Sequence, residues 1–571
     1  MNNITNFKLL KDLWSVVDQK NKLIFFLILS LIGALADAVN IGLLIPFLKV
    51  IETPEILNNY FLYKILADLF SITTNPRIFI LSLFMFFLTV SAVFRIYINW
   101  YTLKISYSIS EKLASKIYEQ VLNRDFLEHV KENSSKTVSD VTFRVDATTK
   151  VLMSIVIIIN NIILSLLIFI TLLYIDFSAI GVVILIIGII YASVTFLLRS
   201  RFNENSKIIT KNQTSLIKSL QEGLGGIKEV ILSSTQPFFV KEFNKSYSKL
   251  NTSLVFNNFF AQSPKLVIET LSILLLLIFY YYSFTQGKGI AELTGLIGVL
   301  AFGAQKLIPS FQAIYQNWSN ITSNKFLVIE IIKILKNVLN NSIQNNPLLF
   351  QKELKLNFNS FSYARDQDSI LNNIDLKISK GEKIGILGPS GSGKSTLINL
   401  LVGLISDFKG TLEIDGKIVD QRTINSWRNQ IAYVPQNVFL FDASLKSNIM
   451  FGTKNKQDID LKELLSQVKL NSFIGNRNID TIQLGERGSK ISGGEKQRIA
   501  LARALFKKAS LIVFDEATNA LDKKVEREIF EIIYQLDNIT IIVISHDTQN
   551  LYGCDKMYEI KNKNLQQFEI D

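Results

Sequence analysis

Cysteine and histidine are nearly absent from this sequence. Cys554 is the only cysteine among the 571 residues, and His129 and His546 are the only histidines. One cysteine cannot form an intrachain disulfide or a CxxC metal site, and it argues against a cysteine-protease domain. Two histidines likewise argue against a metal site built from several imidazoles. Any chemistry must therefore rest mainly on other residue types.

Charged residues are also sparse, and apolar residues are in excess. Hydrophobic residues make up 48% of the chain and charged residues 19%. The mean hydropathy of +0.27 is high for a soluble protein. A chain of 571 residues is too long for one hydrophobic core, so we expect at least two domains. The apolar excess predicts that one of them consists of lipid-facing helices.

Apolar runs lie in the first part of the chain, and each is close to the ~20 residues that a membrane-spanning helix needs. The six runs are Leu23–Leu48, Ile78–Trp100, Val151–Tyr174, Phe177–Leu198, Leu266–Phe284 and Leu293–Trp318. Ionisable residues in such runs are costly and are candidates for function, although they can also snorkel or form structural pairs. In this sequence they are Asp37, Arg95, Lys265, Glu269 and Lys306.

Basic residues gather in two long segments, between the second and third runs and between the fourth and fifth. The positive-inside rule places both segments in the cytosol, which accounts for much of the net charge of +12 without nucleic acid. We expect helical extensions that break at 125–135 and 223–226, with tips suited to docking on a soluble domain. The polar stretch 1–21 lacks a cleavable-signal pattern and is expected to be a cytosolic, partly amphipathic segment.

The character of the chain changes after Trp318. A polar, Asn-rich linker ends near Pro347, and from about Glu353 short β-branched runs alternate with helical patterns. This alternation is typical of an α/β domain with a largely parallel sheet. We therefore expect an α-helical transmembrane domain with six spans over residues 1–320, a linker over 321–352, and an α/β domain over 353–571.

The run GPSGSGKS at residues 388–395 fits the phosphate-loop pattern G-x-x-x-x-G-K-[ST]. It follows a predicted strand and precedes a predicted helix, so the α/β domain is expected to be a P-loop NTPase domain. Backbone N–H groups and the helix dipole attract phosphate, Lys394 reaches the β- and γ-phosphates of ATP, and Ser395 ligates Mg²⁺. The residues expected to bind nucleotide here are Gly388, Ser390, Gly391, Gly393, Lys394, Ser395 and Thr396.

Two further segments carry chemistry. Asp515 and Glu516 end an apolar run, and we expect Asp515 to hold Mg²⁺ and Glu516 to polarise an attacking water. The run ISGGE precedes a predicted helix, and its residues Ser492, Gly493 and Gly494 form a second phosphate-binding nest. A separate nest beside one lysine-bearing loop suggests two copies acting together, with the nest of one closing over the ATP of the other.

With these motifs the sequence resembles the ABC transporter superfamily over essentially its whole length. The resemblance implies that Tyr363 stacks on adenine, that Gln436 of the YVPQ run senses the γ-phosphate and joins the Mg²⁺ site, and that His546 contacts the γ-phosphate. It identifies ATNALD, ending at Asp522, as a further nucleotide-contacting loop, and it relates TIQLGERG at 481–488 to a loop that touches the docking segments.

The catalytic set implied by this resemblance, Glu516, His546 and Gln436, is intact. A homodimer would then have two competent ATP sites, although pairing with a related half-transporter stays open. The signature ISGGE departs from the usual LSGGQ at Ile491 and Glu495, and we expect these changes to tune ATP contact rather than abolish it. The resemblance implies a multi-pass protein of the bacterial inner membrane with its ATP-binding cassette in the cytosol.

A narrower resemblance concerns the substrate. The segments 40–47, 53–70, 264–269 and 306–310 look like those of bacterial lipid-linked-oligosaccharide flippases of the Pgl type. That family has arginines, thought to bind a lipid pyrophosphate, where Lys265 and Lys306 stand here, and with Arg95 these are the expected substrate residues. The alternatives are export of drugs, lipids or peptides, an ATP-gated channel, or an ABC ATPase acting on DNA or ribosomes, which the apolar runs argue against.

Overall fold

The computed structural model describes residues 20–52, 76–175, 177–285, 290–338, 346–363, 368–453, 460–517 and 523–569. It divides into two units, one formed by Met1–Arg124 with Glu128–Asn341 and the other by Asp125–Leu127 with Ser342–Asp571. The first unit is helical, and the second contains the strands. Most of the expected cytosolic stretch 1–21, the expected external segment 53–70 and the turn at Asp176 lie outside the described residues.

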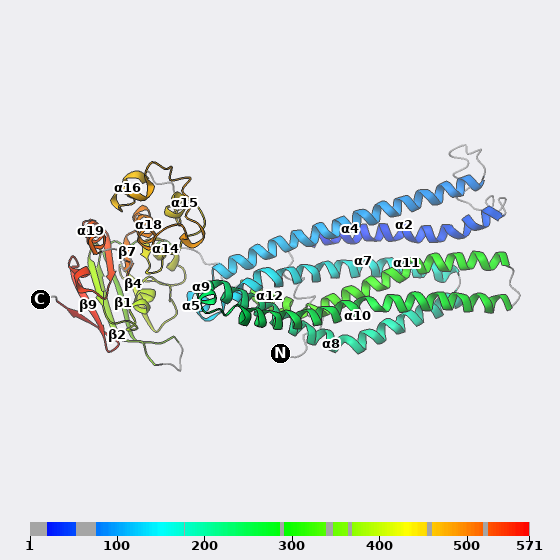
Figure 1. Ribbon diagram of the computed structural model, residues 1–571. Coiled ribbons are helices and arrows are strands. Elements are labelled where there is room, and N and C mark those ends of the chain that lie inside the picture. Colours follow the sequence, from blue (N-terminus) through cyan, green and yellow to red (C-terminus); the bar gives the residue numbers. More distant parts are fainter. Residues whose placement is uncertain are drawn as a thin grey trace. The chain divides into compact units, whose positions relative to one another are not determined.

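Long helices carry all of the predicted apolar runs in the predicted order. They are α2 (Lys20–Glu52), α4 (Pro76–Leu122), α7 (Val145–Ile175), α8 (Phe177–Gly225), α10 (Gln236–Thr285) and α11 (Ile290–Ser323). Helix α2 packs along α4, α11 along α7, and α10 along α8 (Figure 1). These neighbours bring residues that are far apart in the sequence to the same level of the bundle.

Four helices in the described part of the chain are long and apolar enough to cross a membrane. The segments are Asn21–Leu44, Arg77–Leu122, Ser134–Leu173 and Gln236–Ile278. The fourth and sixth predicted runs belong to α8 and α11, where part of each run lies outside the residues whose side chains are described.

Both long basic segments are helical and break where the sequence predicted. Between α4 and α7 lie α5 (Phe126–Lys131), α6 (Ser134–Ser139) and a π-helical turn, η2 (Asp140–Arg144). Between α8 and α10 lies α9 (Ile227–Leu232), which begins directly after the glycines at 225 and 226. The extensions of the spans were thus predicted correctly, because their polar and apolar residues keep a helical spacing.

A helix, α12 (Lys325–Val338), occupies the stretch for which the sequence predicted a linker. Its residues Leu327, Val328 and Ile331 are buried among side chains of the helical unit. Glu330 on this helix forms an ion pair of 2.7 Å with the buried Arg144 of η2. The apolar side chains of α12 therefore belong to the core of the helical unit, and the polar residues that suggested a linker flank it.

The second unit contains a six-stranded sheet with the order β10-β9-β3-β8-β7-β6. Strands β9 (Lys556–Lys561), β3 (Lys383–Leu387), β8 (Thr540–Ile544), β7 (Leu511–Asp515) and β6 (Ile431–Val434) run parallel, and β10 (Asn564–Phe568) is antiparallel to β9. All five residues of β8 are buried. Near-continuous apolar strands are typical of a parallel sheet covered on both faces.

A separate antiparallel sheet adds to the predicted parallel one. It has the order β2-β1-β4-β5, formed by β2 (Leu371–Ser379), β1 (Glu353–Phe361), β4 (Gly410–Ile414) and β5 (Lys417–Ile418). Burial largely alternates along β2, as expected for a strand with one face on the core. The remaining helices are α13 (Lys394–Leu401), α14 (Ile424–Asn429), α15 (Leu445–Ile449), α16 (Leu461–Gln467), α17 (Asn471–Ile474), η3 (Glu486–Gly488), α18 (Gly493–Phe506), α19 (Lys523–Tyr534) and η4 (Thr548–Leu551).

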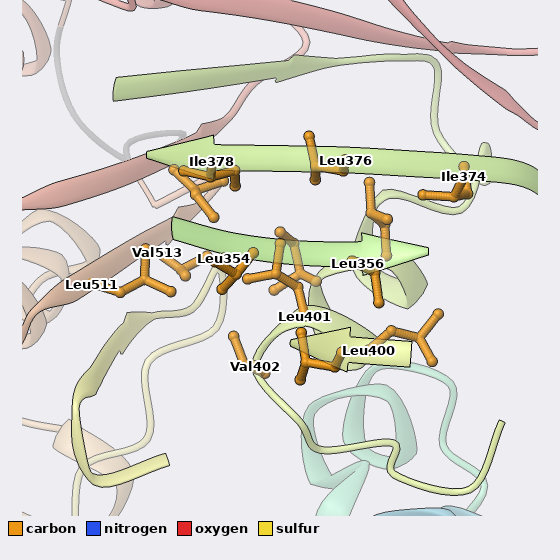
Figure 2. Packing of buried hydrophobic residues seen from close by; sticks show 14 of the residues in the cluster. Leu354, Leu356, Ile374, Leu376, Ile378, Leu400, Leu401, Val402, Leu511 and Val513 are labelled. Carbon is orange, nitrogen blue, oxygen red and sulfur yellow. The ribbon is translucent and has the colours of Figure 1, made fainter. Parts of the chain in front are cut away.

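The core between these elements fixes the position of the phosphate loop. Figure 2 shows Leu354 and Leu356 of β1 and Leu376 of β2 packed near Leu400 and Leu401 of α13. Each of these side chains is fully buried or nearly so, and burying a leucine stabilises a fold by about 1.5–3 kcal/mol. Helix α13 is therefore held firmly between the sheets, and its N-terminus opens the loop that precedes it.

Candidate functional site

The phosphate loop joins the end of β3 to the start of α13, as the sequence predicted. Gly393 is the N-cap of α13 and has a φ of +104°. A Cβ at this position would lie 2.9 Å from Cδ2 of Leu371, so both the backbone angle and the space require glycine. Ser390, Gly391 and Ser395 are exposed. The loop therefore presents its backbone N–H groups and the Ser395 hydroxyl at the positive end of α13.

Lys394 places its charge inside this loop. The side chain is only 7% exposed, and its Nζ donates hydrogen bonds to the carbonyl oxygens of Gly388 at 2.7 Å and Pro389 at 3.0 Å. The same Nζ lies 3.7 Å from Oε1 of Glu516. An ammonium group in this position can meet the β- and γ-phosphates of a nucleotide that enters the loop.

Glu516 follows β7 and has a φ of +45°. Its Oε2 accepts a hydrogen bond of 2.9 Å from Nε2 of Gln436, and its Oε1 faces Lys394. Three residues that the sequence assigned to catalysis or phosphate binding thus meet in one place. A carboxylate held here between two donors is positioned to orient a water molecule at the end of a phosphate chain.

Asp515, the last residue of β7, accepts a hydrogen bond of 2.6 Å from the hydroxyl of Tyr433 on β6. Burial raises the pKa of the Asp515 carboxyl. Burial and the bond to Asp515 raise the pKa of the Tyr433 hydroxyl. Sequence reasoning missed Tyr433, although it belongs to the YVPQ run that contains Gln436. Its strand pairs with β7 in a register that the local pattern does not reveal.

The side chains predicted to hold Mg²⁺ are of a suitable kind. Ser395, Gln436 and Asp515 offer hydroxyl, amide and carboxylate oxygens, which are the ligand types that Mg²⁺ prefers alongside phosphate oxygens. Within the described residues no cluster of three His, Cys, Asp or Glu side chains could hold a metal by itself. A Mg²⁺ ion held by these residues and the nucleotide would neutralise phosphate charge.

The second predicted nest begins α18. Ser492 is its N-cap, and the side-chain oxygen of Ser492 accepts from the backbone N–H of Glu495 at 3.3 Å. Glu495 Oε2 accepts in return from the backbone N–H of Ser492 at 2.7 Å. This capping box keeps Gly493 and Gly494 in the first turn of a 14-residue helix. The departure Glu495 therefore has a structural role here, since its carboxylate is one half of the cap.

The remaining predicted nucleotide residues are placed as follows. The hydroxyl of Tyr363 lies 3.1 Å from Oγ1 of Thr396 in the first turn of α13. His546 is exposed two residues after the end of β8. Strands β3, β8 and β7 are parallel neighbours, so the phosphate loop, His546 and Glu516 all follow the carboxyl ends of adjacent strands. Ligands bind at this edge in open parallel sheets. Asp522 lies outside the described residues.

The charged candidates in the helical unit fall into two groups. Arg95 and Lys306 both contact the buried Asp37, at 2.6 Å and 3.0 Å. Lys265 instead faces Glu269, one turn away on α10, at 3.6 Å, and both of these side chains are about half exposed. The structure therefore gathers two of the three predicted substrate residues and leaves the third in the local pair that the sequence offered as an alternative.

Comparisons with known proteins agree with both units. The family description "ABC transporter" matches residues 371–519, and "ABC transporter transmembrane region" matches residues 41–297. The heterocyst differentiation ATP-binding protein HepA of Nostoc sp. is 27% identical over 94% of this chain and 88% of its own length. The ATP-dependent lipid A-core flippase of Desulfotalea psychrophila is 33% identical over 49% of this chain and 48% of its own length.

A solved structure extends the likeness to the whole fold. The structure of a bacterial Atm1-family ABC exporter with ATP bound superposes with a TM-score of 0.77 at 19% identity, over 95% of this chain and 94% of the other. The phosphate loop, the two carboxylates and the capped nest described above all lie within the matched cassette region. The chain therefore belongs to the ABC transporters, as an exporter-type half-transporter with a membrane domain fused to an ATP-binding cassette that couples ATP hydrolysis to transport.

Proposed function

We propose that this half-transporter moves an amphipathic substrate with an anionic head across the bacterial inner membrane, with a lipid-linked oligosaccharide as the best candidate. The observation that supports this most directly is the pair of cations, Arg95 and Lys306, between apolar helices. Such charges are costly in a bilayer and are retained where they act on a ligand or on each other. A phosphate or pyrophosphate head with a long apolar tail fits cations in apolar surroundings.

We propose that two chains pair, either as a homodimer or with a related half-transporter. Each ATP then lies between the loop 388–395 of one chain and the nest Ser492–Gly494 of the other. Glu516 acts as general base, Gln436 and His546 contact the γ-phosphate, and Mg²⁺ is held by Ser395, Gln436 and Asp515. Tyr363 stacks on the adenine, and Asp522 contributes from its loop. The membrane lipid bilayer surrounds the helical unit, the cassette lies in the cytosol, and nucleic acid plays no part.

A second candidate is export of a drug, lipid or peptide without a phosphate head. The lysine at position 265 keeps this open, because its side chain pairs with Glu269 and is half exposed. A lysine also lacks the bidentate fork with which an arginine binds a pyrophosphate. A substrate recognised mainly by apolar contacts would depend little on Arg95, Lys265 and Lys306. An ATP-gated channel on the same scaffold would pass ions without moving a lipid.

The experiment is ATP-driven translocation in liposomes that contain the full chain. Wild type and Glu516→Gln are compared with ATP and with a nonhydrolysable analogue, using a polyprenyl-pyrophosphate glycan, a neutral lipid and a hydrophobic dye as substrates. The proposal expects wild type to move the glycan lipid and the variant to move nothing. If only the dye or the neutral lipid moves, the proposed glycan-lipid substrate is wrong and the molecule that moves takes its place. Ion currents without translocation would favour the channel, and ATP-independent movement would refute the proposed function.

A further inference from the structure

A cluster of charged and polar side chains joins three helices of the membrane domain. Oδ1 of Asp37 on α2 accepts hydrogen bonds from Oγ of Ser91 at 2.7 Å and from Nη2 of Arg95 at 2.6 Å, both on α4. The same oxygen accepts from Nζ of Lys306 on α11 at 3.0 Å. Arg95 also donates to the Ser91 hydroxyl at 2.9 Å. One carboxylate oxygen thus receives three donors from two other helices.

The cluster carries a net positive charge in apolar surroundings. Arg95 and Lys306 contribute one positive charge each and Asp37 one negative charge, which leaves one positive charge without a counter-ion inside the cluster. Asp37 lies within the apolar segment Asn21–Leu44, and Ser91 and Arg95 lie within Arg77–Leu122. Lys306 lies on α11, and the neighbouring residues Ile41 and Leu307 are buried. A desolvated net charge is unfavourable unless an anion approaches it.

The three charged side chains differ in how open they are. The side chain of Asp37 is 2% exposed, that of Lys306 is 16% exposed and that of Arg95 is 47% exposed. A group that approaches the bundle can therefore reach Arg95, and to a lesser extent Lys306, whereas Asp37 lies behind them. The carboxylate is placed to neutralise the two cations from the protein side, and their other donors can face a ligand.

Helix α11 is built to allow small changes near this cluster. Pro309, three residues after Lys306, lies inside the helix and cannot donate a backbone hydrogen bond. Gly303, three residues before Lys306, allows close packing, because a Cβ there would lie 2.8 Å from Cδ1 of Leu172 on α7. Lys306 thus lies between a close contact of α11 with α7 and a position where the backbone hydrogen-bond ladder of α11 is interrupted by Pro309.

We propose that Asp37 is an internal counter-ion that holds Arg95 and Lys306 until the phosphate or pyrophosphate head of a substrate replaces it as their partner. This inference rests on the proposed function and names the part of the site that recognises the head group. Because an anion of two or more charges outcompetes a single carboxylate for two cations, binding releases Lys306 and Arg95 from Asp37. The link from α2 to α4 and α11 then loosens when the substrate is present.

The alternative role for the cluster is structural, with Asp37 simply joining three helices. Breaking an ion pair that joins helices is destabilising in such a case, and every variant would lose stability. A structural role predicts no dependence on the charge of the lipid. A counter-ion predicts that removing Asp37 and removing Lys306 change anionic-lipid affinity in opposite directions, and this difference of sign separates the two roles.

The test measures lipid binding by the purified full chain in nanodiscs, with the nucleotide-free protein. The probes are undecaprenyl phosphate, undecaprenyl pyrophosphate and neutral undecaprenol. The variants are Asp37→Asn, Lys306→Gln, Arg95→Gln and the double variant Asp37→Asn with Lys306→Gln, which restores the wild-type net charge of the cluster. Asp146→Asn and Lys150→Gln serve as matched controls, because this exposed pair on α7 has an ion-pair distance of 2.7 Å and lies outside the cluster.

The proposal expects Asp37→Asn to bind undecaprenyl pyrophosphate more tightly, on the order of tenfold, and Lys306→Gln and Arg95→Gln more weakly by a similar factor. The double variant should fall between the single variants, undecaprenol should be unaffected, and undecaprenyl phosphate should show smaller changes of the same sign. Thermal unfolding of each variant is measured alongside. If Asp37→Asn does not fold, the double variant is compared with Lys306→Gln, and the proposal expects it to bind undecaprenyl pyrophosphate more tightly than Lys306→Gln alone.

Equal loss of affinity in all variants, together with a lower melting temperature, would assign the cluster a structural role and overturn the inference. Wild-type affinity for the anionic lipids in Lys306→Gln and Arg95→Gln would also overturn it. The proposed function is scored separately, by ATP-driven translocation in wild type. Translocation without the charge-dependent affinities refutes the counter-ion alone, whereas no translocation of any lipid by wild type refutes the proposed function.

Discussion

Gln436 donates a hydrogen bond of 2.9 Å from Nε2 to Oε2 of Glu516. Gln436 follows β6 and Glu516 follows β7, so this bond connects the ends of two neighbouring parallel strands. The other carboxylate oxygen of Glu516 faces Nζ of Lys394 at 3.7 Å. The carboxylate is thereby held by one residue of the phosphate loop and one of the YVPQ run. Both segments therefore contact the carboxylate that we propose as the general base.

Replacement of Glu516 by glutamine should remove hydrolysis and keep ATP binding. Glutamine preserves the size of the side chain but cannot accept a proton, so we expect kcat to fall by about 10²–10⁴-fold. ATP affinity should change little, because Lys394 and the loop remain. Phosphate release and binding of a fluorescent ATP analogue measure the two effects. Glu531→Gln, an exposed carboxylate paired with Arg527, is the control, and equal loss of activity in both variants would contradict the assigned role.

The capping box at Ser492 predicts different outcomes for two substitutions of Glu495. Alanine removes the acceptor for the Ser492 N–H, so we expect the cassette to lose about 1 kcal/mol of stability. Glutamine keeps an acceptor oxygen and removes a negative charge from the nest. In the proposed dimer the apparent KM for ATP should then fall by roughly fivefold, the equivalent of about 1 kcal/mol between unit charges at 4 Å in water.

Thermal unfolding and ATP-dependent turnover separate these two effects. Glu463→Gln is a useful control, because Glu463 lies in the first turn of α16 while the N-cap there is the side chain of Asp460. If Glu495→Gln destabilises the cassette as much as Glu495→Ala, the box does not depend on the side-chain oxygen. An unchanged KM would mean that the carboxylate does not meet nucleotide phosphate.

The residues that we propose for the ATP site were nominated from the sequence because their motifs are local. A phosphate loop, a strand that ends in two carboxylates and a capped helix start are each read from fewer than a dozen consecutive residues. The contact between Tyr433 and Asp515 was missed, because it depends on the pairing of β6 with β7. Likewise Asp37, Arg95 and Lys306 were each nominated from the sequence, but their meeting depends on how three helices pack.

The fold could likewise be predicted where it follows from local sequence patterns, and could not where it depends on contacts between distant segments. Long helical runs and the breaks at 125–135 and 223–226 follow from hydrophobic periodicity. The antiparallel sheet of β2, β1, β4 and β5 was not separated from the parallel one, since strand pairing is set by contacts distant in sequence. Helix α12 was read as part of a linker because asparagines flank it on both sides, although its buried face identifies it as a core element.

Gly393→Ala should destabilise the phosphate loop. The added Cβ would lie 2.9 Å from Cδ2 of Leu371, and a φ of +104° is unfavourable for alanine. We expect a loss of about 1–3 kcal/mol in cassette stability and of most ATP binding. Gly452→Ala is the matched control, with a φ of +82° and no heavy atom within 4 Å of the added Cβ. Unfolding midpoints with and without ATP measure the stability and the ATP binding of each variant. If Gly393→Ala and Gly452→Ala have equal effects, the contact with Leu371 has no role.

The rate at which Cys554 is alkylated, measured against pH, tests how the cassette is folded around this thiol. Its thiol lies 3.5 Å from the hydroxyl of Tyr534, and burial raises its pKa to about 11. At pH 8 the thiolate fraction is then roughly 0.1%, against roughly 25% for a thiol with the usual pKa of about 8.5. From these thiolate fractions we expect alkylation of the native protein to be roughly 250-fold slower than that of the unfolded protein at pH 8, and its rate to rise about tenfold per pH unit up to about pH 11.

The contribution of the Cys554 thiol to cassette stability falls as the pH rises, whereas the alkylation rate increases. A raised pKa means that the folded state prefers the protonated thiol, so this contribution is complete below the ordinary pKa and is lost as the pH rises through about 11. Alkylation by iodoacetamide, followed by mass spectrometry of the intact chain, gives the rate at each pH, and Cys554→Ser should abolish the signal because the chain has no other cysteine. A native rate that equals the unfolded rate at pH 8 would show that the thiol is neither buried nor raised in pKa, and the packing of Cys554 against Tyr534 would have to be abandoned.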